Sequence, residues 1–130
     1  MIEVEVTRLW IYPVKSMKGI EVGEATLTAE GLEHDRRFMV VGADGRFVTQ
    51  RDQPKLALIH TSLSEGVIEL SRAGFGTVSV PPDRLQGDIV LTKVWGDQCE
   101  TVDQGEEISR LLTAALESES RVRLVRMKEG

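Results

Sequence analysis

The sequence predicts a mostly β protein, a small antiparallel β-barrel of about seven to nine strands with one amphipathic helix near the C-terminus. Many short segments rich in β-branched and aliphatic residues alternate with turn residues. Only one segment, late in the chain, repeats apolar residues with the period of a helix. The chain has 130 residues, 41% of them hydrophobic and 28% charged, which is typical of one soluble domain. We therefore predict a single domain over residues 1–130.

The first strands are predicted from alternation of apolar and polar residues. Segment 24–29 alternates cleanly, as expected of a strand with one buried face. Segment 2–12 alternates at first, but the pattern slips near Arg8 and Leu9, which predicts a bulge or a strand buried on both faces. Segments 37–41 and 46–50 flank residues 42–45, which contain an Asp-Gly pair. Because glycine adopts positive φ at little cost, Asp-Gly between two apolar runs predicts a β-hairpin.

The later strands follow the same logic. Residues 64–66 predict a second hairpin. The short strand 77–80 must end at Pro81, because proline has no N–H to donate to a ladder. The predicted strands are 55–63, 67–71, 77–80, 88–95, 98–102 and 121–127.

One helix is predicted between the last two strands. Asp103 is placed to cap its first turn, with Glu106 three residues later as in a capping box, and residues 118–120 end it. Its apolar residues fall on one helical face. They are Ile108, Leu111, Leu112, Ala115 and Leu116.

Charge and composition exclude several classes of protein. Sixteen basic against twenty-one acidic residues give a net charge of −5, so a general nucleic-acid binder is not expected. No apolar run approaches the ~20 residues of a membrane span, and no secretory signal is visible at the N-terminus. One cysteine cannot form an internal disulfide. We therefore predict a cytoplasmic protein that does not bind membranes.

The sequence offers no generic catalytic or metal motif. His34, His60 and Cys99 lie far apart in the sequence, so no metal site is predicted. There is no P-loop, nucleophile elbow or dinucleotide fingerprint, and no catalytic residue is assigned. We expect Cys99 to be a small buried apolar residue.

Two polar clusters interrupt the strand pattern. In residues 12–19, Lys15 supplies a cation and Ser16 a hydroxyl, which together suit an anion such as phosphate. In residues 31–38, Arg36 carries a planar guanidinium that binds phosphate with two hydrogen bonds, and Asp35 is placed to hold it. Taken singly, the first cluster is also compatible with an ordinary basic turn and the second with a structural Asp-Arg pair.

A third polar stretch, residues 49–55, follows the first predicted hairpin. It either lines the same opening as the two clusters or is a hydrophilic connection. The sequence leaves both possibilities open.

Together these segments resemble a known family, the N-terminal β-barrel domain of MOSC-type molybdenum-cofactor proteins. That family includes the mitochondrial amidoxime-reducing component and the C-terminal region of molybdenum cofactor sulfurase. The similarity covers nearly the whole chain. The segments that carry it are residues 9–16, 31–32, 35–36 and 47–51, followed by 94–97, 103–105 and 123–125.

The resemblance implies a share in a cofactor site. In the family this barrel precedes a MOSC domain, the molybdenum cofactor (molybdopterin) lies between the two, and the MOSC domain supplies the cysteine that ligates molybdenum. Lys15 and Ser16 match the family's Lys-Ser that meets the pterin phosphate, and Arg36 matches its cofactor-contacting arginine. Cys99 does not match the metal-ligating cysteine. The resemblance thus implies a cofactor-binding half-site that needs a MOSC-domain protein or redox partner and is not active alone.

Two alternatives remain at the level of sequence. The first is a non-enzymatic interaction module that docks another protein through its barrel rim or its helix, which lies in an acidic segment with seven acids and one base over residues 97–119. The second is an enzyme acting alone on amidoximes or other N-hydroxylated compounds. The second is disfavoured because no molybdenum-ligating cysteine is assigned.

Overall fold

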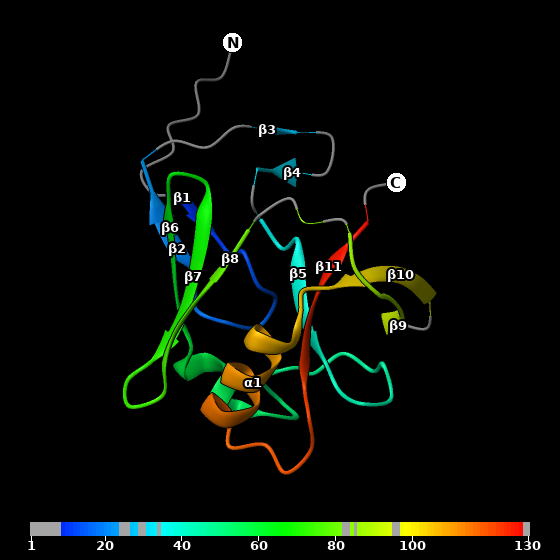
Figure 1. Cartoon of the computed structure of the whole chain (residues 1–130). Coiled ribbons are helices and arrows are strands. Elements are labelled where there is room, and N and C mark those ends of the chain that lie inside the picture. Colours follow the sequence, from blue (N-terminus) through cyan, green and yellow to red (C-terminus); the bar gives the residue numbers. More distant parts are fainter. Residues whose placement is uncertain are drawn as a thin grey trace.

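The computed structural model describes residues 9–23, 27–28, 31–33, 35–81, 84, 86–94 and 97–128. The predicted strand residues 2–8, 24–26, 29 and 95, and His34, lie outside the described residues. The elements, in chain order (Figure 1), are β1 (Leu9–Ile11), β2 (Ile20–Val22), β3 (Leu27–Thr28), β4 (Gly31–Leu32), β5 (Phe38–Val41), η1 (Pro54–Leu58), β6 (His60–Ser64), β7 (Val67–Arg72), β8 (Gly76–Val80), β9 (Ile89–Val94), β10 (Asp97–Asp103), α1 (Glu106–Ala115) and β11 (Arg123–Met127).

The strands pair antiparallel, as predicted. In the described residues they form a four-stranded sheet in the order β5-β11-β10-β9, a three-stranded sheet β6-β7-β8, and the pairs β1-β2 and β3-β4. Within this part of the chain the pairing does not run continuously around a cylinder. A mostly β chain with one C-terminal helix is therefore confirmed.

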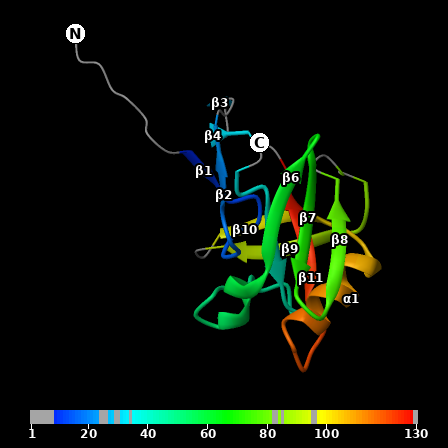
Figure 2. The same ribbon diagram turned by 90° about the vertical axis from the view of Figure 1, so that its left-hand side faces the viewer.

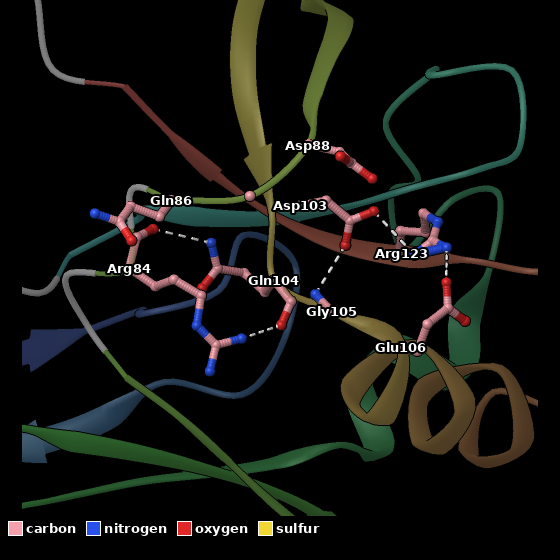
Figure 3. A pocket seen from close by; sticks show the side chains of 9 residues that line it. Arg84, Gln86, Asp88, Asp103, Gln104, Gly105, Glu106 and Arg123 are labelled. Atoms are coloured by element: carbon pink, nitrogen blue, oxygen red, sulfur yellow. Dashed lines mark hydrogen bonds and ion pairs between the residues drawn. The ribbon is translucent and has the colours of Figure 1, made fainter.

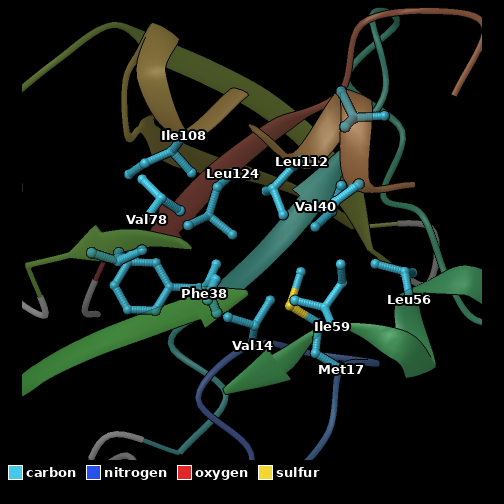
Figure 4. Close-up of a cluster of buried hydrophobic side chains, with 14 of the residues drawn as sticks. Val14, Met17, Phe38, Val40, Leu56, Ile59, Val78, Ile108, Leu112 and Leu124 are labelled. Carbon is cyan, nitrogen blue, oxygen red and sulfur yellow. The ribbon is translucent and has the colours of Figure 1, made fainter. Parts of the chain in front are cut away.

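The main core lies where the two larger sheets and α1 meet (Figures 2 and 4). Side chains of β5 alternate between its two faces, as in any strand. Phe38 and Val40 enter the main core, whereas Met39 and Val41 pack with Val125 in a smaller cluster. All four β5 residues are buried, so this strand is covered on both faces.

The helix is present, but its start differs from the prediction. Its predicted apolar face is confirmed, since four of the five residues are buried and Leu111 packs partly buried against the core. The capping box of Asp103 and Glu106 is wrong, because Asp103 ends β10 and Gly105 occupies the N-cap without a side-chain cap bond. The Asp103 carboxylate instead accepts the Gly105 N–H at 2.8 Å and pairs with Arg123 at 2.9 Å. No helix in the described ranges is long and apolar enough to cross a membrane.

Two predicted strands also differ. The prediction of a strand over 55–63 is wrong in its first half, because residues 54–58 form η1 and β6 begins only at His60. Pro54 explains this, since it has no N–H for a ladder and its fixed φ suits a first helical turn. The 42–45 turn is confirmed by the Gly45 N–H bond to the Gly42 carbonyl at 3.0 Å. The predicted strand 46–50, which follows this turn, is reduced to an isolated bridge between Val41 and Phe47.

Candidate functional site

The two predicted polar clusters lie side by side and are joined through their backbones. The Arg36 N–H donates to the Tyr12 carbonyl at 2.6 Å, and the Phe38 N–H donates to the Pro13 carbonyl at 3.2 Å. The Lys15 N–H in turn donates to the Phe38 carbonyl at 2.9 Å. A short parallel pairing thus brings together segments that are more than twenty residues apart in sequence.

Asp35 links the two segments through its side chain. One carboxylate oxygen accepts the Tyr12 N–H at 2.7 Å, and the other lies 2.7 Å from Nη1 of Arg36. The Arg36 guanidinium also lies over the Tyr12 ring, 5.0 Å from its centroid, a distance typical of a cation–π contact. The Arg36 side chain nevertheless stays 57% exposed. Its guanidinium is therefore oriented from two sides and still open to a ligand.

Ser16 occupies the third position of a tight turn. The Met17 N–H donates to the Val14 carbonyl at 3.2 Å, and Ser16 has a φ of 72°. These features define a type II β-turn, whose third position favours Gly or Asn. A serine in the left-handed region costs roughly 1 kcal/mol, because its Cβ atom comes close to the following carbonyl oxygen. Arg36 also has positive φ, 50°, so two of the three predicted site residues have an unfavourable backbone conformation.

The third polar segment reaches the first. The Gln50 side-chain amide donates to the Ser16 carbonyl at 2.5 Å. Just before that segment, the Phe47 ring centroid lies 4.6 Å from the Lys15 ammonium. Gln50 of the third polar segment thus contacts the first cluster, and whether the segment lines a shared site stays a prediction. We call Lys15, Ser16 and Arg36 the basic cluster.

A separate pocket lies at the N-terminal end of α1 (Figure 3). It has a volume of about 400 Å³, within the range of small-molecule sites. Arg123 pairs with Asp103 at 2.9 Å and with Glu106, so opposite charges on its walls neutralise each other. We call it the helix-end pocket. Its lining residues are Arg84, Gln86, Gly87, Asp88, Asp103, Gln104, Gly105, Glu106 and Arg123.

Gln104 ties the walls of the helix-end pocket together. Its side chain is buried, and its amide nitrogen donates to the carbonyls of Arg84 at 3.2 Å and Val102 at 3.1 Å. The Arg84 guanidinium donates to the Gln104 carbonyl in return. The Gln104 Oε1 atom is buried without a hydrogen-bond partner. Sequence reasoning did not single out this pocket, because its residues come from separate segments with no local pattern.

The described residues hold no group of three or more His, Cys, Asp or Glu side chains placed for a metal ion. Cys99, predicted to be buried, is half-buried on β10. The His60 ring lies 3.5 Å from the Lys18 ammonium.

Exposed large apolar side chains are spread over several elements. Among the residues whose burial the structure describes, β9 alone contributes two of them. They are Trp10, Leu58, Val67, Phe75, Ile89 and Leu91.

Comparison with known proteins identifies the family. Residues 3–119 match the model of the MOSC N-terminal beta barrel domain, and the chain belongs to this family. It is 39% identical over 116 residues to molybdenum cofactor sulfurase of Danio rerio, a match that covers 85% of this chain and 14% of that protein. It is 36% identical over 119 residues to mitochondrial amidoxime-reducing component 1 of Homo sapiens, covering 88% of this chain and 35% of that one. The chain thus spans well under half the length of these relatives.

A solved structure supports the same fold. The solution structure of a Bordetella bronchiseptica protein superposes with a TM-score of 0.62 at 18% sequence identity. The match covers 75% of this chain and 82% of that one. The chain thus shares its fold with the Bordetella protein, and by sequence it is related to the barrel domain of proteins associated with the molybdenum cofactor.

Proposed function

We propose that this domain binds the phosphate of the molybdenum cofactor (molybdopterin) through Lys15, Ser16 and Arg36. The observation that carries the proposal is the pairing of two strained residues, Ser16 and Arg36, on adjacent hydrogen-bonded segments. Strained backbone persists where the surrounding structure holds it, and it is concentrated at functional sites. The name of the sulfurase relative supports the choice of cofactor.

The donors of the basic cluster fit a phosphate group. Among the described residues, neither the hydroxyl nor the N–H of Ser16 has a hydrogen-bond partner, so both can donate to an anion. Arg36 uses Nη1 for Asp35 and is otherwise exposed. Lys15 adds a second cation in the adjacent segment. Two cations and a hydroxyl match a dianionic phosphate without any catalytic base.

The residues of this chain would bind and orient the cofactor, not carry out its reaction. When bound, the molybdenum cofactor supplies redox chemistry at its metal. We assign no ligand to that metal in this chain. We propose that a MOSC domain supplies the remaining half of the site, so that the activity of the complete protein depends on both halves.

An NMR titration of the purified chain tests the proposal. We expect a phosphorylated pterin to shift the amide signals of Lys15, Ser16 and Arg36, more strongly than inorganic phosphate does. Arg36→Ala should weaken binding by about tenfold to a hundredfold, the range of a hydrogen bond between charged groups. Arg110→Ala, an exposed arginine on α1, is the matched control and should leave affinity unchanged.

Two results would count against the proposed function. Equal shifts with pterin and inorganic phosphate would reduce the cluster to a general anion site. If Lys15→Ala and Arg36→Ala bind the pterin as tightly as the unmodified chain, the site assignment is wrong.

A further inference from the structure

We infer that Gln50 is a positioning residue that holds the Ser16 turn in the form that meets an anion. The inference rests on the proposed function of the basic cluster. Gln50 lies 34 positions from Ser16 in sequence, yet its side-chain amide donates to the Ser16 carbonyl at 2.5 Å. This is a contact between the third polar segment and the residue at which the first one turns.

The Ser16 turn needs such a contact because two forms compete. Types I and II of a β-turn differ by a flip of the central peptide, here the one between Lys15 and Ser16. That flip reverses the direction of the Ser16 N–H. Serine does not favour the positive φ of the type II form, which Ser16 adopts at 72°. By fixing the Ser16 carbonyl, Gln50 restrains the φ and ψ of Ser16 and so the direction in which its N–H points.

Gln50 is itself held on a fixed turn. The N–H groups of Asp52 and Gln53 donate to the Thr49 carbonyl at 3.1 and 2.8 Å. The Thr49 hydroxyl donates to the Asp52 carboxylate at 3.2 Å. The turn leads directly into η1, whose Leu56 is buried in the main core. The turn that carries Gln50 is therefore connected directly to a helix anchored in the main core.

The chemistry of the contact requires an amide. Gln50 donates from a neutral side chain, so it orients the turn without pairing with the phosphate charge. A carboxylate of the same length would place negative charge beside the Ser16 carbonyl and beside the bound anion. Gln50→Glu should therefore impair phosphate binding more than Gln50→Ala does.

The test has one readout with a ligand and one without. Inorganic phosphate is titrated by NMR into the full chain, and exchange of the Met17 amide with water is measured in its absence. Because Met17 donates the hydrogen bond that closes the turn, its exchange reports turn geometry directly. We expect Gln50→Ala to raise the phosphate Kd by about three- to tenfold, and to speed Met17 exchange by a similar factor. Gln98→Ala, an exposed glutamine on β10, should change neither quantity.

A second background separates positioning from general structural damage. Glycine adopts positive φ freely, so Ser16→Gly should keep the type II turn without help. In that background Gln50→Ala should leave Met17 exchange nearly unchanged. An equal acceleration in both backgrounds, or none in the natural one, would overturn the role of Gln50. If the unmodified chain binds neither phosphorylated pterin nor inorganic phosphate, the proposed function fails, and Met17 exchange still decides the role of Gln50.

Discussion

The basic cluster and the helix-end pocket are both polar, but their groups are used in opposite ways. In the pocket, Arg123 is paired with two carboxylates and the Gln104 amide nitrogen is bound twice, with one oxygen of Gln104 left over. In the basic cluster, Ser16 and Arg36 accept an unfavourable backbone conformation and keep donors directed to no other residue in the described chain.

A pocket is therefore not by itself better evidence of a ligand site than an exposed cluster of hydrogen-bond donors. Charges that neutralise each other across a pocket wall hold that wall together, whereas donors without partners on a strained backbone are available to an anion. We therefore expect changes at the pocket to alter stability and changes at the basic cluster to alter binding.

The largest effect is expected at Gly87, beside the helix-end pocket. A Cβ atom there would lie 2.7 Å from the Asp103 carbonyl oxygen and 3.3 Å from the Val102 side chain. Because the obstacle is backbone, the loop must shift, and Gly87→Ala should lower the free energy of unfolding by about 1–3 kcal/mol. Urea denaturation measures this. Gly23→Ala, which meets nothing within 4 Å, is the control, and equal stability of the two variants would contradict the prediction.

A smaller loss of stability is expected at Arg123. Replacing it with methionine leaves the Asp103 carboxylate, only 10% exposed, without its cation. Arg123→Met should lower the free energy of unfolding by about 1–2 kcal/mol, the range for a stranded buried polar group. Phosphate affinity at the basic cluster should not change. Arg110→Met should stay within about 0.5 kcal/mol of the unmodified chain. A loss of phosphate binding in Arg123→Met would break the separation between the two regions.

The reverse pattern is expected at Gly19. A Cβ atom there would lie 2.6 Å from the Tyr12 ring, which can swing aside because it is a side chain and not backbone. The ring would then leave the Arg36 guanidinium, and an exposed cation–π contact contributes about 0.5–1 kcal/mol. Gly19→Ala should therefore weaken phosphate binding by about two- to fivefold with little change in urea stability. A stability loss as large as that of Gly87→Ala would contradict this view.

The smallest effect is expected at Glu117, which belongs to neither region. Hydrogen bonds from Lys55, and then from Arg72, lower the pKa of its carboxyl below the usual 4.5. A depressed folded-state pKa gives stability that is fully present above the unfolded-state pKa and is lost as pH falls through the folded-state pKa. Urea denaturation of Glu117→Gln and of the unmodified chain, at pH 7 and below pH 4, measures the contribution of Glu117 to the free energy of unfolding. The difference between the two chains should shrink at the lower pH and at high salt.

Local patterns in the sequence predicted much of the fold. The alternating segments and the apolar face of α1 depend on period, which a sequence displays directly. The prediction of a strand over 55–63 was wrong in its first half, because the apolar residues there suit a helical turn that begins with proline as well as they suit a strand. The capping box failed because Asp103 is paired in β10.

The candidate site was predictable only in part. Residue type and family resemblance identified Lys15, Ser16 and Arg36. They did not reveal the type II turn, the Gln50 contact across 34 positions or the helix-end pocket. The contact and the pocket depend on segments that come together only on folding, which no local period in the sequence encodes. The turn was missed because its third position holds Ser16 and not the Gly or Asn that predicts type II.

The parallel pairing of residues 12–15 with residues 36–38 also bears on how relatives can be recognised. Because main-chain hydrogen bonds set the distance between Lys15 and Arg36, the number of residues connecting the two segments is free to vary. A sequence search that demands a fixed gap between the Lys-Ser and Asp-Arg pairs would discard proteins that keep the same geometry. A search that scores the two pairs separately and leaves the gap open would retain them.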